Sequence, residues 1–147
     1  MEFTSRDKYF MDLAKITSNR SKDPNTKVGA CIVKNKRVVS LGYNGAPRRI
    51  SDDLVPYSYR DKSLPRRENK YMYILHAEVS AILNSCGRME DLEESSIYVT
   101  TFPCVECTKI LIQCGISSIY YLNEYTDSDD AKYLCDLAGV SYFNMES

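Results

Sequence analysis

The chain lacks an excess of charge of either sign. Its 147 residues hold 19 Lys and Arg against 20 Asp and Glu, so the net charge is −1. A protein that grips long nucleic acid shows a basic excess or stripe, so we expect a small substrate and no nucleic-acid partner. The charge is uneven, however: seven Lys and Arg stand against four Asp and Glu from Pro47 to Lys70. This basic stretch could meet an anion, or the acidic tail of another subunit.

Long hydrophobic runs are also missing. The N-terminal MEFTSRDKYFMDLAKI is charged and amphipathic, unlike a signal peptide, and no run could span a bilayer. We therefore expect a soluble protein of the cytoplasm, or of the host cytoplasm if the source is viral. In such a reducing compartment the six cysteines do not favour a disulfide framework. Their thiols are then buried, catalytic or bound to metal.

Hydrophobic periodicity predicts one domain, residues 1–147, in which helices and strands alternate. Helical spacing occupies 5–19, 74–86, 104–115 and 127–139. Runs rich in β-formers occupy 28–33, 37–44, 95–101, 116–122 and 140–145. The order is typical of an α/β sandwich, a mixed five-stranded sheet with helices on both faces. The first two strands form an antiparallel hairpin, and strands joined by helices should run parallel.

Histidine is scarce: His76 is the only one, and Glu78 follows two residues later in LHAEVSAI. A second unusual motif is PCVEC, whose Cys104 and Cys107 are spaced by one helical turn, so both sulfurs can face one point. The N-terminus of a helix favours thiolate over thiol. Two thiolates and one imidazole supply three positions of a zinc tetrahedron, and a catalytic site keeps the fourth for water.

Each motif alone leaves alternatives open. A single CxxC could be half of a structural zinc site, a redox pair or chance, and a lone histidine is more often structural than a ligand. H-x-E followed by P-C-x-x-C, in that order, is the pattern of the zinc deaminases. It predicts zinc ligands His76, Cys104 and Cys107. The remaining thiols fall in apolar segments and are expected in the core: Cys31, Cys86, Cys114 and Cys135.

Glu78 is predicted to be catalytic and not a metal ligand. On an ideal helix its side chain points about 200° away from that of His76, but the first turn need not be fully helical. The carboxylate could then reach past the metal to a water. Zn²⁺ is already neutralised by two thiolates, so a nearby general base is needed at neutral pH.

Together, HAEVSAI, PCVEC, RSKDPNTKVGACIV and GYNGAP, with SDD after it, resemble the deoxycytidylate (dCMP) deaminases from about Lys8 to Phe143. The resemblance implies the three-layer α/β/α fold of the cytidine-deaminase superfamily. It implies hydrolysis of dCMP to dUMP and ammonia, which feeds thymidylate synthesis, with Glu78 carrying the protons. The additional Cys and His residues of relatives with a second, structural zinc are missing, so one zinc per subunit is expected.

The same resemblance implies contacts to the nucleotide. The backbone near Ala77 would contact the base and Asn44 the sugar, although N-G is equally a plain turn signal. Ser21, Lys22 and Tyr121 would surround the 5′-phosphate, although Ser21 and Lys22 also fit a solvated helix end.

Regulation is implied as well. Members of this family form homo-oligomers, often hexamers, that dCTP with Mg²⁺ activates and dTTP inhibits. The effector site would lie around the GYNGAP turn and the polar, aperiodic loop after it. A connection of that length inside a compact domain is usually functional or disordered. The residues concerned are Asn44, Gly45, Pro47, Arg48, Arg49 and Asp52.

Other deaminases, and one class without catalysis, remain as alternatives. The substrate could be free cytidine, tRNA adenosine or cytosine in single-stranded DNA, but polynucleotide enzymes need a basic groove with stacking aromatics. An inert, zinc-stabilised binding module would have no use for Glu78.

Overall fold

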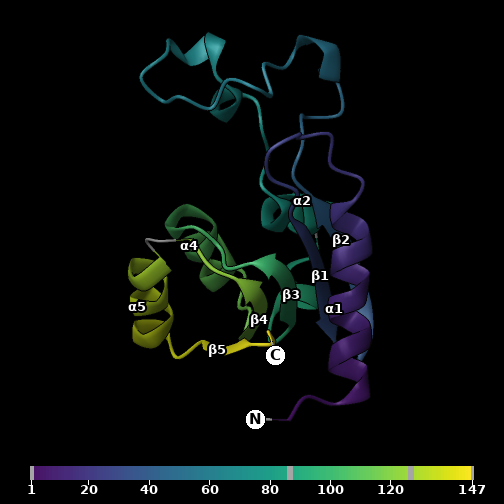
Figure 1. Ribbon diagram of the computed structural model, residues 1–147. Helices are drawn as coiled ribbons and strands as arrows, with labels where there is room; N and C mark the ends of the chain where they lie inside the picture. The colour runs from purple at the N-terminus through teal and green to yellow at the C-terminus, as the bar shows by residue number, and fades with distance from the viewer. Residues whose placement is uncertain (1, 86–87, 126–127, 147) are drawn as a thin grey trace.

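The computed structural model describes residues 2–85, 88–125 and 128–146 and has one five-stranded sheet (Figure 1). The strand order is β2-β1-β3-β4-β5. β1 runs antiparallel to β2 and β3, whereas β3, β4 and β5 are parallel. The strands are β1 Gly29–Lys34, β2 Arg37–Tyr43, β3 Ser96–Thr101, β4 Ser118–Asn123 and β5 Ser141–Asn144. The mixed five-stranded sheet predicted from the sequence is confirmed.

Helices cover both faces of the sheet because the strand residues alternate between two cores. Cys31 and Val33 face one side and pack with Phe10 and Met11 of α1, Ser5–Ser18. Ala30, Ile32 and Ile97 face the other. On that second face lie α2 Ala77–Asn84, α4 Val105–Gln113 and α5 Ser128–Ala138. The three-layer α/β/α fold is therefore confirmed, with a short additional helix, α3 Met89–Leu92.

Local sequence signals set the ends of several elements. Thr4 caps α1 in a reciprocal capping box with Asp7. Asn35 and Lys36, both with positive φ, make the two-residue turn between β1 and β2. Gly115 and Gly139 follow α4 and α5 with φ of 83° and 74°, conformations that favour glycine. Both helices therefore end within two residues of the ends predicted for them, 115 and 139.

The predicted helix 74–86 is wrong at its start. Ile74 and Leu75 precede α2, and Leu75 pairs with Gly45 in an isolated bridge. Leu83 is exposed, and the buried residues of α2 are Ala77, Glu78 and Ala81. Close packing explains the small residues: a Cβ on Gly42 of β2 would lie 2.5 Å from the Ala77 oxygen. Cys86, Gly87 and Asp127 lie outside the described residues.

Residues 46–72, which we call the arm, extend away from the three layers (Figure 1). The arm holds three short 3₁₀ turns: η1 Asp52–Leu54, η2 Arg66–Glu68 and η3 Lys70–Met72. It leads from the end of β2 to the start of α2, so the long polar loop of the sequence becomes an ordered projection beside that helix. None of the helices in the described part of the chain is long and apolar enough to cross a membrane.

Candidate metal centre and active site

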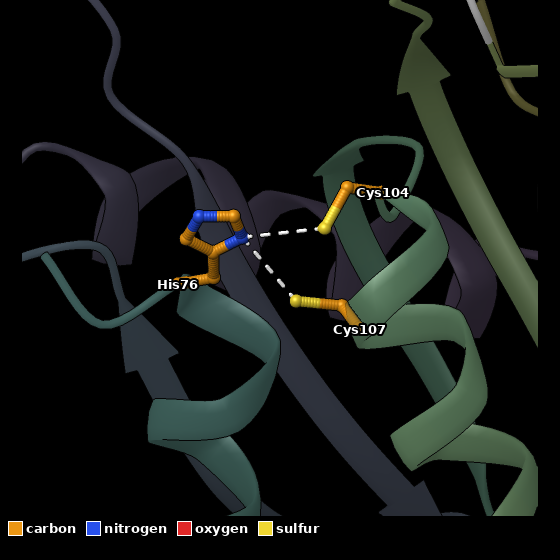
Figure 2. Close-up of side chains that lie close together, drawn as sticks. All are labelled: His76, Cys104 and Cys107. Carbon is orange, nitrogen blue, oxygen red and sulfur yellow. Dashed lines mark hydrogen bonds between the residues drawn. The ribbon is translucent and has the colours of Figure 1, made fainter. Parts of the chain in front are cut away.

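Two helix N-termini meet at the three predicted zinc ligands (Figure 2). His76 is the N-cap of α2 and Cys104 the N-cap of α4, while Cys107 lies in the first turn of α4. Phe102 and Pro103, both buried, bring the chain from the end of β3 to Cys104. Because helix N-termini carry partial positive charge, both helices favour anionic ligands at this point.

The distances match a tetrahedral zinc site. Nδ1 of His76 lies 3.5 Å from Sγ of Cys104 and 3.3 Å from Sγ of Cys107. A tetrahedron with Zn–N and Zn–S bonds of about 2.0 and 2.3 Å has edges of roughly 3.5 to 3.8 Å. Among the described residues, these three form the one cluster of His, Cys, Asp or Glu ligand atoms close enough to hold a metal. A three-ligand set leaves the fourth position open, as in catalytic zinc sites.

The two thiols titrate as a pair. The Cys107 thiol and His76 hydrogen-bond to the Cys104 sulfur, which lowers the pKa of Cys104 to about 4. The same interaction, with burial, raises the pKa of Cys107. The pKa of His76 is raised, first by its hydrogen bond to Cys104. One thiolate therefore forms readily, and a bound dication favours the second.

Glu78 lies next to this cluster without belonging to it. It is 4% exposed, and burial raises its pKa above that of a free glutamate, while the charge of His76 acts in the opposite direction. His76 has extended backbone angles, φ −73° and ψ 155°, so it is not yet helical. Because His76 is not helical, the 200° separation of an ideal helix does not apply, and the side chains of His76 and Glu78 can both lie at one site.

The described thiols outside the site stay protonated at neutral pH. Cys31, Cys114 and Cys135 are buried, as predicted. Burial raises the pKa of Cys31 to about 12 and that of Cys135 to about 11, and it raises the pKa of Cys114 as well. Among the five described cysteines, reactive thiolate character is thus confined to the pair beside His76.

Comparison with known proteins agrees with this geometry. Residues 4–123 match the family model of the cytidine and deoxycytidylate deaminase zinc-binding region. The chain belongs to this deaminase family. It is 43% and 42% identical to the deoxycytidylate deaminases of Pongo abelii and Homo sapiens, in each case over 91% of this chain and 76% of the relative. The dCMP deaminase of cyanophage S-TIM5, solved in complex with dCMP and dUMP, superposes with a TM-score of 0.80 at 26% identity over 99% of this chain and 100% of that one. The family predicted from the sequence motifs is confirmed.

Asn44 and Ser21, which the deaminase resemblance assigns to nucleotide binding, make side-chain hydrogen bonds to backbone groups. Oδ1 of Asn44 accepts from the Val28 N–H at 2.9 Å, and its Nδ2 donates to the Thr26 carbonyl at 2.8 Å. The Ser21 hydroxyl donates to the Asn44 carbonyl at 2.8 Å. Both side chains are buried. The structure thus brings Ser21 and Asn44 together and shows a structural role for each, while their contacts to substrate stay predictions.

The other predicted residues are dispersed around the site. Ala77 is buried directly after His76. Lys22 is exposed and pairs with Asp52 of the arm at 3.1 Å. Gly45 bonds to Leu75, the residue before His76, in both directions. Of the remaining residues that the resemblance assigns to an effector site, Arg48 and Arg49 are exposed and Pro47 is half-buried.

Tyr121 points into the core on the face of α4 and α5. Its ring packs edge-on against Phe102, with ring centroids 4.8 Å apart, and the Lys132 ammonium lies 5.5 Å from its centroid. Only 4% of Tyr121 is exposed. Its contact with the 5′-phosphate stays a prediction.

Tyr125, two residues after β4, was not among the residues predicted from the sequence. The pKa of Tyr125 is raised to about 12, first by burial and then by the negative charges of Glu78, Cys104 and Cys107. Its phenol stays protonated at neutral pH, and 42% of the residue is exposed. A usable signal existed: ligands bind at the carboxyl ends of parallel strands, and Tyr125 follows β4 as Cys104 follows the parallel β3.

Proposed function

We propose that this protein is an enzyme that hydrolyses dCMP to dUMP and ammonia and so supplies dUMP for thymidylate synthesis. The observation that carries the proposal is the buried Glu78 beside an open three-ligand metal site. The substrate follows from identities of 42 and 43% to deoxycytidylate deaminases and from the likeness to a dCMP deaminase that binds dCMP and dUMP.

The chain's residues have distinct tasks in this reaction. His76, Cys104 and Cys107 would hold one zinc ion, which when bound acts as a Lewis acid and lowers the pKa of water. The Glu78 carboxylate takes a proton from the attacking water and delivers it to N3 of the pyrimidine, which makes C4 electrophilic. The oxygen of the water adds to C4, and Glu78 then takes the second proton, from the hydroxyl now on C4, and gives it to the amino group. The C–N bond breaks, ammonia leaves, and the oxygen on C4 becomes the carbonyl of dUMP.

The nucleotide contacts belong to the same proposal. The backbone at Ala77 contacts the base and Asn44 contacts the sugar. Ser21, Lys22 and Tyr121 surround the 5′-phosphate. Support comes from their place in the matched family region and from the hydrogen bond that joins Ser21 to Asn44.

Regulation by nucleotides is proposed for the segment 44–52, where the chain leaves β2 and enters the arm. dCTP with Mg²⁺ would activate and dTTP would inhibit a cytoplasmic homo-oligomer, a hexamer, through Asn44, Gly45, Pro47, Arg48, Arg49 and Asp52. The exposed Arg48 and Arg49 suit a triphosphate. We expect Arg48→Ala/Arg49→Ala to lose activation by dCTP while keeping activity at saturating dCMP. Full activation of that variant would count against this site.

The proposed activity is tested by ammonia release from dCMP, cytidine, dCTP and a short oligonucleotide, measured side by side with a zinc count per chain. We expect dCMP to have the highest kcat/KM and one zinc per chain. Preference for cytidine or for the oligonucleotide would move the assignment to those deaminases. A zinc-loaded protein that releases no ammonia from any of them would instead be the inert binding module.

A further inference from the structure

Asp23 and Lys70 form a buried ion pair that the proposed reaction does not use. Lys70 Nζ lies 2.6 Å from Asp23 Oδ2, and the two residues are only 5% and 1% exposed. Lysine and aspartate are almost never fully buried unless they are paired. Neither residue belongs to a regular helix or strand: Asp23 lies between α1 and β1, and Lys70 begins η3 of the arm.

The Asp23 carboxylate organises its own segment with its other oxygen. Oδ1 accepts hydrogen bonds from the backbone N–H groups of Asn25, at 2.8 Å, and Thr26, at 3.2 Å. The Asp23 N–H in turn donates to the Ser21 hydroxyl at 3.3 Å. One carboxylate thus fixes the turn of residues 20–27, which carries Ser21 and Lys22, and docks that turn on Lys70.

Lys70 organises the other side with its backbone. Its N–H donates to the Tyr59 carbonyl at 2.9 Å, which ties down the arm. Its carbonyl accepts from the N–H groups of Tyr73 and Ile74 at 2.9 and 3.2 Å. The next residue, Leu75, exchanges two hydrogen bonds with Gly45, and His76 follows. Lys70 therefore connects the turn of residues 20–27, the arm and the chain that enters the metal site.

The pair suits positioning better than stability. A buried ion pair contributes little net stability over a well-packed apolar pair, but breaking it leaves an uncompensated buried charge. Docking through such a pair is close to all-or-none. The other contacts between this turn and the arm are weaker: Lys22–Asp52 is exposed and screened by solvent, and the Asn25 side chain donates a single bond to the Tyr57 carbonyl. Near its two ends, at Ser21 and Thr26, the turn is also held by hydrogen bonds to Asn44.

We propose that the Asp23–Lys70 pair is a positioning device for the deaminase reaction: it fixes the distance between the turn of residues 20–27 and the metal ligands. The inference rests on the proposed function, in which Ser21 and Lys22 hold the phosphate while His76 and Glu78 serve the base. His76 has its own anchor in the Gly45–Leu75 bridge, so loss of the pair displaces the phosphate end and leaves the metal end in place.

The test compares Lys70→Met, Asp23→Asn and the double variant, all in the zinc-loaded protein. We expect each single variant to raise KM for dCMP by about tenfold or more, with kcat within about threefold and zinc still at one per chain. The double variant should have a KM no higher than the worse single, because no unpaired charge remains buried. Hydrogen exchange in the segment 20–27 should accelerate in all three, with exchange in β3 unchanged.

Two controls separate positioning from general stability. Lys15→Met removes an exposed lysine 4.0 Å from Asp12 and should change nothing. Ile119→Val weakens the core of β4 and should lower the melting temperature without changing KM.

A KM within twofold of wild type in Lys70→Met, with unchanged exchange in the segment 20–27, overturns the proposal. Loss of kcat together with zinc overturns it too, as does failure of both the single and the double variants to fold, because the pair is then purely structural. A wild-type protein that does not deaminate dCMP refutes the proposed function, whereas the exchange measurement still tests the docking.

Discussion

Replacement of Glu78 by glutamine is the sharpest test of the site, because it changes one atom of a side chain that is 4% exposed. The amide keeps the size of the carboxylate but cannot carry a proton between water, ring and leaving group. Loss of a general acid–base typically costs 10²- to 10⁴-fold in rate. Since Glu78 would serve two successive proton transfers in the proposed reaction, we expect a loss of about 10⁴-fold or more, which corresponds to about 5.5 kcal/mol.

The same substitution should not weaken the fold. Burial raises the pKa of Glu78, so ionisation is less favourable in the folded chain than in the unfolded chain. The protonated carboxyl of Glu78 therefore contributes stability below the unfolded pKa, and this stability is lost as pH rises through the folded pKa. At neutral pH the glutamine removes that cost, partly offset by the lost attraction to His76. The melting temperature should stay the same or rise.

The assay measures ammonia release, zinc per chain and melting temperature for Glu78→Gln. The matched control is Glu106→Gln, the same substitution one residue before Cys107, where the side chain is 79% exposed and pairs with Lys109 at 2.9 Å. The control should keep nearly full activity. A zinc-loaded Glu78→Gln protein that retains more than about one hundredth of wild-type turnover would refute the assigned role.

Three further substitutions test the zinc ligands, the hydrogen bonds of Asn44 and the packing of α2 on β2. Cys107→Ser should bind zinc too weakly to keep one ion per chain through dialysis, as metal analysis would show; full retention would contradict the ligand set. Asn44→Ala should lower the free energy of unfolding in urea by about 1–3 kcal/mol, because the buried Val28 N–H loses its acceptor; an unchanged midpoint would deny its structural role. Gly42→Ala should cost about 1–3 kcal/mol by forcing α2 off β2, because the new Cβ would lie 2.3 Å from the Ala81 nitrogen; an unchanged melting temperature would contradict the close packing.

Much of the fold was predictable because its signals are local. Alternation along β1 and β3, the glycines after α4 and α5, and the turn at Asn35–Lys36 all act within a few residues. The metal site was predictable for a related reason. Cys104 and Cys107 are spaced by one turn, and His76 and Glu78 open one helix, so only the meeting of two helix ends had to be inferred.

The errors arise where distant segments meet. Ile74 and Leu75 continue an apolar helical spacing, but Leu75 is held by Gly45, thirty residues away, and α2 cannot begin before His76. Asp23 and Lys70 lie 47 residues apart, and each looks like an ordinary solvated charge in the sequence. No periodicity reveals such a pair, because its burial depends on the docking of two irregular segments.

Tyr121 of β4 and Tyr125 of the loop after it are selected by two different arguments, the family motif and the position along the sheet. The resemblance selects Tyr121, which packs on Phe102. The position at the carboxyl edge of the sheet selects Tyr125. The pKa of its phenol is raised first by partial burial and then by the charges of Glu78 and Cys104. We expect Tyr125→Phe to raise KM for dCMP more than Tyr121→Phe does, while Tyr121→Phe lowers the melting temperature more, because Tyr121 is only 4% exposed and the substitution removes its hydroxyl from the packed core. The reverse order in KM would show that Tyr121 turns out of the core to meet the substrate, and that position along the sheet edge is a poorer guide than the motif.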